Sequence, residues 1–103
     1  MAGDQLRLRV KVMGKLWNLL FVPESKIPKI NGEPNTGLTD SPGTKDKSMR
    51  VATELEGEER FEIILHELMH AGNWHLDEEF VREFCEDAAR IFWRLGYRQM
   101  EGL

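Results

Sequence analysis

The sequence predicts a small α+β protein, in which a small antiparallel or mixed sheet packs against two helices joined as a hairpin. Residues 5–22 alternate apolar and polar side chains in the manner of β-strands. Residues 57–72 and 77–95 instead repeat apolar side chains at helical spacing. A chain of 103 residues has the length of one domain, and residues 1–103 are therefore assigned to a single domain.

The first two strands are expected as a hairpin over residues 5–22. Apolar side chains occupy every second position of residues 6–12, and the positions between them are basic: Arg7, Arg9 and Lys11. This alternation indicates a strand with one face toward the core and one toward water. Met13-Gly14-Lys15 is a plausible turn, and the apolar run Leu16–Val22 completes the hairpin before Pro23.

Residues 23–47 are predicted to form a long loop, because they contain all four prolines of the chain and three glycines. Gly37-Leu38-Thr39-Asp40 could form a short extended piece inside this loop. Residues 49–53 are predicted to form an edge strand, with Met49, Val51 and Thr53 on one side. This strand directly precedes the first helix.

Two helices complete the predicted fold. Thr53 and Glu56 have the spacing of a capping box, which places the start of the first helix near Gly57, and Gly72 is a natural end for it. Asp77 is a good N-cap for the second helix, and Gly96 stops that helix. The short connection between the helices predicts that they pack side by side and antiparallel.

The segment His66-Glu67-Leu68-Met69-His70 lies inside the first predicted helix and contains the candidate metal-binding and catalytic residues. Residues four apart lie one turn apart on one helix face, so both imidazoles can reach a single metal ion. A glutamate beside the first histidine can handle a metal-bound water. The segment therefore predicts a zinc site with His66 and His70 as ligands and Glu67 as the catalytic group.

A catalytic zinc ion usually has three protein ligands and one open position, so a third ligand is expected. The candidates are His75 in the connection and three acidic residues of the second helix, Glu78, Glu79 and Glu83. A simple antiparallel register places Glu79 level with His70, whereas Glu78 points more clearly toward the apolar stripe. Glu78 and Glu79 are therefore favoured as the third metal ligand, with Glu79 slightly ahead. Asp87 is either an acceptor for a ligand imidazole or a solvated residue.

Composition restricts the class of partner and the compartment. The net charge is −4 and the sequence pI is about 5.4, which argues against a general nucleic-acid or anionic-membrane surface. The single cysteine, Cys85, lies in an apolar helical pattern, which is typical of a buried thiol in a reducing compartment. No signal peptide or membrane span is evident, so a cytoplasmic location is expected. The sequence does not define the oligomeric state.

At His66-Glu67-Leu68-Met69-His70 the chain resembles the zincin superfamily of metallopeptidases, in its glutamate-liganded, thermolysin-like branch. It is also similar to small phage and bacterial zincin-like proteins at Leu76-Asp77-Glu78-Glu79 and at Trp93–Tyr97. The resemblance covers roughly residues 37–98. It implies a minimal zincin-like domain, which would act in the host cytoplasm if it is encoded by a phage.

The resemblance also implies a function, a zinc metallopeptidase that acts on a peptide or protein substrate. His66 and His70 would bind zinc, and Glu67 would take a proton from zinc-bound water as the water attacks a peptide carbonyl. The peptide would lie along the strand at residues 49–53. Tyr97 either assists the oxyanion or has a packing role. The alternative function is a non-catalytic zinc-binding accessory protein that binds a partner through the same groove.

Overall fold

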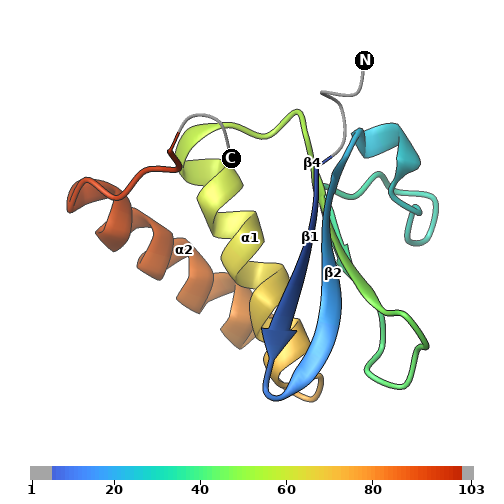
Figure 1. Cartoon of the computed structure of the whole chain (residues 1–103). Coiled ribbons are helices and arrows are strands. Elements are labelled where there is room, and N and C mark those ends of the chain that lie inside the picture. Colours follow the sequence, from blue (N-terminus) through green and yellow to red (C-terminus); the bar gives the residue numbers. More distant parts are fainter. Residues whose placement is uncertain (1–5, 101–103) are drawn as a thin grey trace.

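The computed structural model describes residues 6–100, and it is an α+β fold with a mixed four-stranded sheet and two helices (Figure 1). Within this range no helix is long and apolar enough to cross a membrane. The expected hairpin start at residue 5 lies outside the described residues. The elements are, in chain order, β1 (Leu6–Val12), β2 (Lys15–Val22), the 3-10 helix η2 (Glu24–Lys26), β3 (Gly37–Thr39), β4 (Ser48–Ala52), α1 (Gly57–Gly72) and α2 (Glu78–Arg94).

The sheet has the strand order β1-β2-β4-β3. Strands β1 and β2 form the expected antiparallel hairpin, with Leu6 opposite Phe21 and Val12 opposite Lys15. Met13 and Gly14 turn the chain with φ values of 51° and 80°, which is the backbone twist that two-residue hairpin loops favour. The hairpin prediction is confirmed.

Strand β4 is internal, so the prediction that residues 49–53 form an edge strand is wrong. It pairs with β2 in parallel and with β3 antiparallel, and Thr39 lies opposite Met49. Met49 and Val51 are at most 1% exposed, and four of the five residues of β4 are buried. Burial on both faces and along both edges leaves β4 no side on which a peptide could add.

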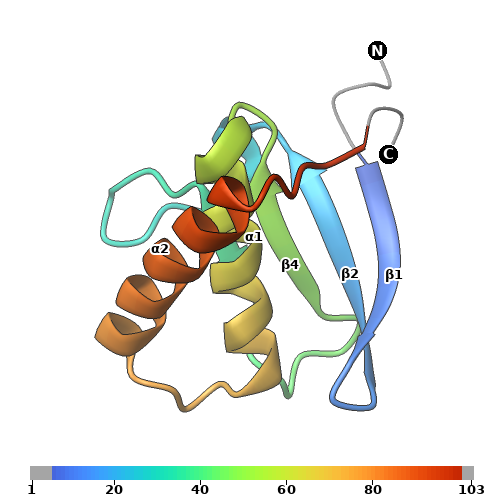
Figure 2. The ribbon, with the colours of Figure 1, turned by 90° about the vertical axis from the view of Figure 1, so that its left-hand side faces the viewer.

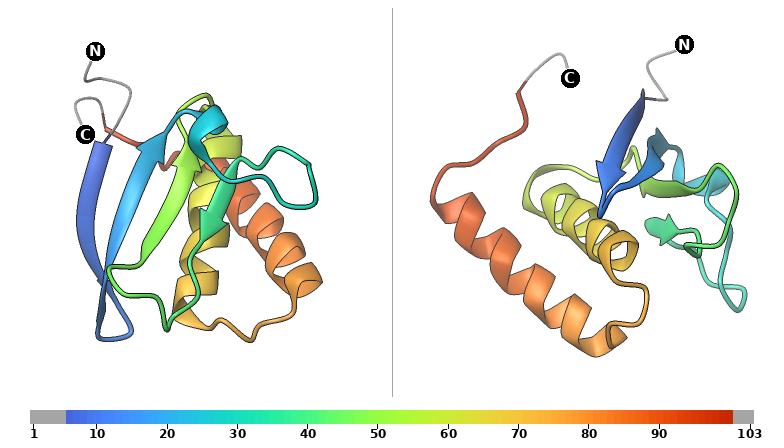
Figure 3. Two further views of the ribbon diagram at one scale, coloured as in Figure 1. Left: turned by 90° about the vertical axis from the view of Figure 1, so that its right-hand side faces the viewer. Right: turned by 60° about the horizontal axis from the view of Figure 1, so that its bottom comes forward.

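The predicted loop at residues 23–47 contains β3, and β3 is the sheet edge beside α1. Parallel neighbours such as β2 and β4 need a long connection, and the proline-rich segment supplies it. The segment then adds β3 on the outer side of β4 before the chain enters β4 itself (Figure 3). The short extended piece expected near Gly37 is this strand.

Helix α1 lies between the sheet and α2, so the protein has three layers (Figures 2 and 3). Its Ile63 and Ile64 pack on a core of five buried residues from the sheet and its connections: Phe21, Ile27, Val51, Ala52 and Leu55. Helix α2 turns Val81, Cys85 and Ala89 inward, each with no exposed surface. Cys85 Sγ contacts Met69 Sδ of α1 at 3.4 Å, which confirms that the thiol is buried.

The predicted helix caps agree with the structure for α2 but not for the start of α1. The expected capping box is absent: Glu56 is the N-cap of α1 and makes no side-chain capping bond. Thr53 lies three residues before this N-cap, and its backbone N–H donates to Val22 O and extends the sheet. Asp77 does cap α2, and its carboxylate accepts a hydrogen bond from Phe80 N at 3.0 Å. Gly96 ends the second helical segment with a φ of 96°.

Candidate metal centre

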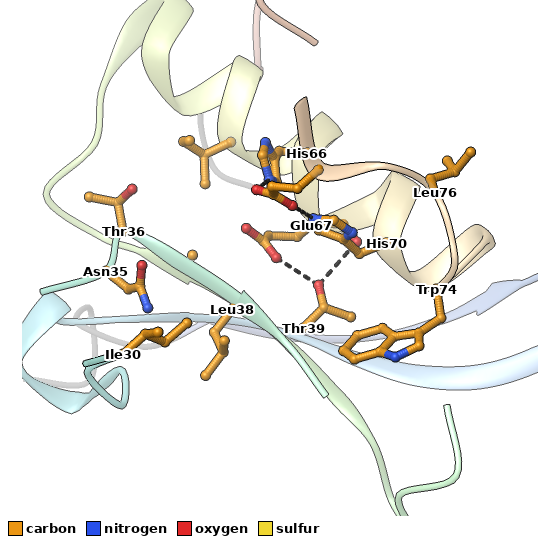
Figure 4. Close-up of a pocket in the computed structure, with 13 residues that line it drawn as sticks. Ile30, Asn35, Thr36, Leu38, Thr39, His66, Glu67, His70, Trp74 and Leu76 are labelled. Carbon is orange, nitrogen blue, oxygen red and sulfur yellow. Dashed lines mark hydrogen bonds and ion pairs between the residues drawn. The ribbon is translucent and has the colours of Figure 1, made fainter. Parts of the chain in front are cut away.

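His66 and His70 of α1 and Glu78 of α2 converge on one point. One ligand atom from each of the three residues lies within 4.8 Å of the other two. His66 Nε2 is 3.1 Å from Glu78 Oε2, and His70 Nε2 is 2.9 Å from Glu78 Oε1. Figure 4 shows both rings on the same side of α1, facing into a pocket. This cluster could hold a metal ion.

The helix hairpin places these side chains. His66 and His70 are one turn apart on α1, and their ring centroids are 4.8 Å apart. The connection is tight, because Asn73 Oδ1 accepts a hydrogen bond from His75 N at 3.0 Å. Asp77 then caps α2, so Glu78 is the first residue of that helix and lies beside the histidines. Residues 66–78 therefore supply all three side chains of the cluster, and the packing of α2 on α1 decides that Glu78 is the glutamate that faces the histidines.

The other predicted ligands lie elsewhere. Glu79 pairs with Arg82 at 3.2 Å, and among the described residues it does not belong to the cluster. His75 and Glu83 are exposed, and within residues 6–100 neither belongs to the cluster. Glu79 is level with His70 in an antiparallel register, but successive side chains of a helix point about 100° apart. Glu79 therefore turns away from α1 when Glu78 faces it.

Asp87 and Tyr97 do not approach the cluster in the structure. Asp87 forms an ion pair with Arg90 at 2.9 Å on the exposed side of α2. Tyr97 packs edge-on against Phe92, with ring centroids 5.3 Å apart, and lines a different groove from the histidines. The packing role is therefore the one that the position of Tyr97 supports.

Glu67 lies beside the cluster and is 5% exposed. Thr39 Oγ1 is 2.7 Å from Glu67 Oε1 and 3.1 Å from the Glu67 backbone oxygen, and it can donate its proton to either (Figure 4). Gly37 brings the backbone of β3 close to the same carboxylate. A β-carbon on Gly37 would lie 2.5 Å from Glu67 Oε2, so only glycine leaves room for this side chain.

Sequence reasoning missed the roles of Gly37 and Thr39. They lie about thirty residues before Glu67, in the segment predicted as loop. The one available signal was the short extended piece at residues 37–40, but a three-residue strand gives too short a pattern to reveal its neighbours.

Burial changes the protonation of the site. It raises the pKa of Glu67 to about 7; the Thr39 hydrogen bond opposes this shift, and the negative charge of Glu78 adds to it. Burial also lowers the pKa of His66, although the Glu78 carboxylate acts in the opposite direction. A lowered pKa favours the neutral imidazole, which is the form that binds metal.

The cluster opens into a cavity of about 540 Å³ between β3 and α1. Its polar lining includes His66, Glu67, His70 and Glu78, and Trp74 stands edge-on to His70 with centroids 6.4 Å apart. Much of the remaining wall is apolar: Ile30, Leu38, Ile63 and Leu76. A few convergent polar groups in a partly apolar cavity are typical of a ligand or substrate site.

No protein-family model, curated protein or solved structure matches this chain. The resemblance to zincins at residues 66–70 therefore stays a prediction.

Proposed function

We propose that this protein is a zinc-dependent peptidase, with zinc bound by His66, His70 and Glu78 and with Glu67 as general base. The observation that carries the proposal is the juxtaposition of the three-residue cluster with a buried carboxylate in one cavity. A glutamate without a functional role is normally exposed to solvent or paired with a cationic side chain. Glu67 instead lies in the wall of the pocket and is bonded to a threonine.

The donor set fits zinc. Two neutral imidazoles and one carboxylate are a ligand set typical of catalytic zinc, and three protein ligands leave one position open. Zinc bound there would supply a Lewis acid that polarises a carbonyl and lowers the pKa of water. Glu78 Oε1 and Oε2 each lie about one hydrogen-bond length from a different histidine, so the carboxylate is already oriented toward both.

Glu67 would hold and transfer the proton. A general base works best when its pKa lies near the operating pH, and the pKa of Glu67 is raised to about 7. Thr39 fixes Oε1, so the carboxylate keeps one orientation relative to the pocket. Glu67 would accept a proton from the attacking water and deliver it to the leaving amine.

An extended peptide would bind along β3. This strand pairs with β4 on one side only, so its other edge can add a strand by backbone hydrogen bonds. Leu38 and Thr39 of β3 line the same cavity as the histidines, so a peptide on this edge would pass the cluster. This edge takes the place of residues 49–53, which are internal.

The test compares two adjacent glutamates. Glu78→Gln should lower the zinc content of the purified protein well below one per chain, whereas Glu79→Gln should leave it unchanged, because Glu79 faces Arg82. Zinc is measured by elemental analysis after dialysis. Equal zinc content in both variants would reject Glu78 as a ligand.

Catalysis is tested separately on the zinc-loaded protein. Glu67→Gln should retain zinc and lose cleavage of a mixture of peptides by about a hundredfold or more, because the base is removed. Cleavage that this substitution leaves unchanged would exclude Glu67 as the base.

The second candidate is a zinc-binding accessory protein without catalysis. The 5% exposure of Glu67 favours it, because a base must reach the water that it activates. This candidate predicts full zinc content and no peptide cleavage in the wild type. Cleavage that depends on both zinc and Glu67 would exclude it.

A further inference from the structure

Helix α2 has a second apolar face that nothing in the described part of the chain covers. Its inner face packs on α1 through Val81, Cys85 and Ala89. A separate set of large apolar side chains on the same helix and at its C-cap is 48–68% exposed. We call this set the outer stripe: Phe80, Phe84, Ile91 and Leu95.

The outer stripe forms one continuous strip along the helix. Its members follow one another at intervals of four, seven and four residues, which returns each of them to the same side. Phe80 and Phe84 stack with their ring centroids 5.7 Å apart. Ala88 lies in the middle of the seven-residue interval, where its small side chain allows close approach of another backbone. A contiguous strip of this kind on a small protein is typical of an interaction surface.

Charges beside the outer stripe have opposite signs at its two ends. The half before Ala88 carries five carboxylates, Glu78, Glu79, Glu83, Glu86 and Asp87, with Arg82 as the single base. The half after Ala88 carries Arg90 and Arg94 and no acid. Most of these charges pair within α2. Within residues 6–100, no ion pair involves Glu83 or Arg94, and these two lie about three turns apart on one flank of the stripe.

We propose that the outer stripe is the interface of a homodimer, in which α2 packs antiparallel on α2 of a second copy and the two helices cross at Ala88. At ~1.5 Å per residue, Phe84 lies ~6 Å before Ala88 and Ile91 ~4.5 Å after it. Phe80 lies ~12 Å before Ala88 and Leu95 ~10.5 Å after it. Antiparallel pairing therefore places Phe80 level with Leu95 of the second copy, and Phe84 level with Ile91.

The same register pairs Glu83 with Arg94, the two charged residues of this flank for which residues 6–100 provide no ion-pair partner. Glu83 lies ~7.5 Å before the crossing point and Arg94 ~9 Å after it, so each Glu83 faces Arg94 of the second copy. Because the interface is isologous, this contact occurs twice. Parallel packing would place the acidic halves together, which disfavours it. The self-complementary charge pattern is the reason for assigning a second copy as the occupant.

The dimer leaves the candidate metal centre accessible. No residue of the outer stripe lines the cavity of His66 and His70. Glu78 begins α2 but points toward α1, whereas the outer stripe faces away from it. The inference is thus independent of the proposed zinc site, and either one can fail without the other.

A charge exchange tests the pairing at low salt, where exposed charges are weakly screened. Glu83→Arg and Arg94→Glu should each weaken dimerisation about tenfold or more, because like charges then meet at both contacts. An equimolar mixture of the two variants should regain wild-type association, since every contact is again between opposite charges. Sedimentation velocity measures the association. Glu33→Arg, at an exposed position outside α2 and outside the outer stripe, is the matched control and should dimerise as the wild type does.

An apolar variant tests the stripe itself. Ile91→Asp should give a monomer with an unchanged circular-dichroism spectrum, because Ile91 is 57% exposed and contributes little to the core. A wild-type chain that remains monomeric at its highest soluble concentration would overturn the proposal. So would single charge variants that dimerise as tightly as the wild type, or a mixture that does not recover.

Discussion

The position of Glu67 depends on two residues of β3. Gly37 leaves room for the carboxylate, and Thr39 bonds to it. Among the described residues, the hydrogen bonds of the Thr39 side chain go to Glu67 and not to His66 or His70. The candidate base can therefore be perturbed while the candidate metal ligands are left unchanged.

Substitution of Gly37 tests this support. Gly37→Ala should displace the Glu67 carboxylate, because the added β-carbon would lie 2.5 Å from Oε2 and 2.8 Å from Ile63 Cγ2. We expect the zinc content to stay near that of the wild type and peptide cleavage to fall about a hundredfold. Gly43→Ala is the control, because a β-carbon on Gly43 meets nothing within 4 Å. Equal cleavage by the two variants would mean that Glu67 tolerates the displacement.

The reactivity of the Cys85 thiol gives a second prediction for a single residue. Burial raises the pKa of Cys85 to about 11, and the charges of Glu62, Glu67 and Glu78 add to the shift. A raised thiol pKa keeps the group protonated, so native Cys85 should react with iodoacetamide much more slowly at pH 8 than the urea-unfolded chain. Its rate should still rise above pH 9, where a thiol of ordinary pKa, about 8.5, approaches its plateau. Since Cys85 is the only cysteine, the labelled site is unambiguous.

The second helix has the stronger N-terminal cap of the two. Asp77 bonds to Phe80 N, whereas the N-cap of α1 has no side-chain bond and Thr53 is held by the sheet. Asp77→Ala should therefore lower the free energy of unfolding by about 1 kcal/mol. Thr53→Ala should change it much less. Urea titrations followed by circular dichroism measure both, and a larger loss for Thr53→Ala would contradict the assignment of the caps.

The helices were predictable from the sequence because their signals are local. The stripe of α1, the cap at Asp77 and the stop at Gly96 each depend on residues within a turn or two. The role of β4 was not predictable in the same way. Residues 48–52 have the pattern of a strand, but only the return of the proline-rich connection as β3 makes that strand internal.

The residues of the candidate site were also predictable only in part. His66, His70 and the acidic start of α2 could be read from the sequence. The choice of Glu78 over Glu79 at the histidines required the rotation of α2 relative to α1, which packing determines. Gly37 and Thr39 could not be predicted, because strand pairing across the sheet sets their distance to Glu67.

At the scale of the whole molecule, a bound metal ion would join α1 to α2. The chain is small, so one such link would be a large part of its stability. Zinc at about a hundred times its dissociation constant would add roughly 2.7 kcal/mol, which corresponds to an increase in Tm of roughly 10 °C or more. Removal of zinc by a chelator should lower the Tm of the wild type by that amount.

Calorimetry with and without chelator checks this expectation. Glu79→Gln should show the same decrease in Tm as the wild type, and Glu78→Gln should show little, because it lacks the third ligand. A wild-type Tm that is equal in zinc and in chelator would contradict a metal link between the helices.

The place of β3 in the chain has a consequence for the order in which the site is assembled. His66, His70 and Glu78 belong to one short helix hairpin, whose contacts are local in sequence, and we expect such local contacts to form early. The contact of Thr39 with Glu67 instead depends on the pairing of β4 with β2 and of β3 with β4, which are distant in sequence, so we expect it to form later. A folding chain would thus bring the three candidate ligands together before the candidate base is positioned. Under the proposed function, the nascent protein would capture zinc before it could hydrolyse a peptide, which would protect its own unfolded segments and its neighbours from premature cleavage.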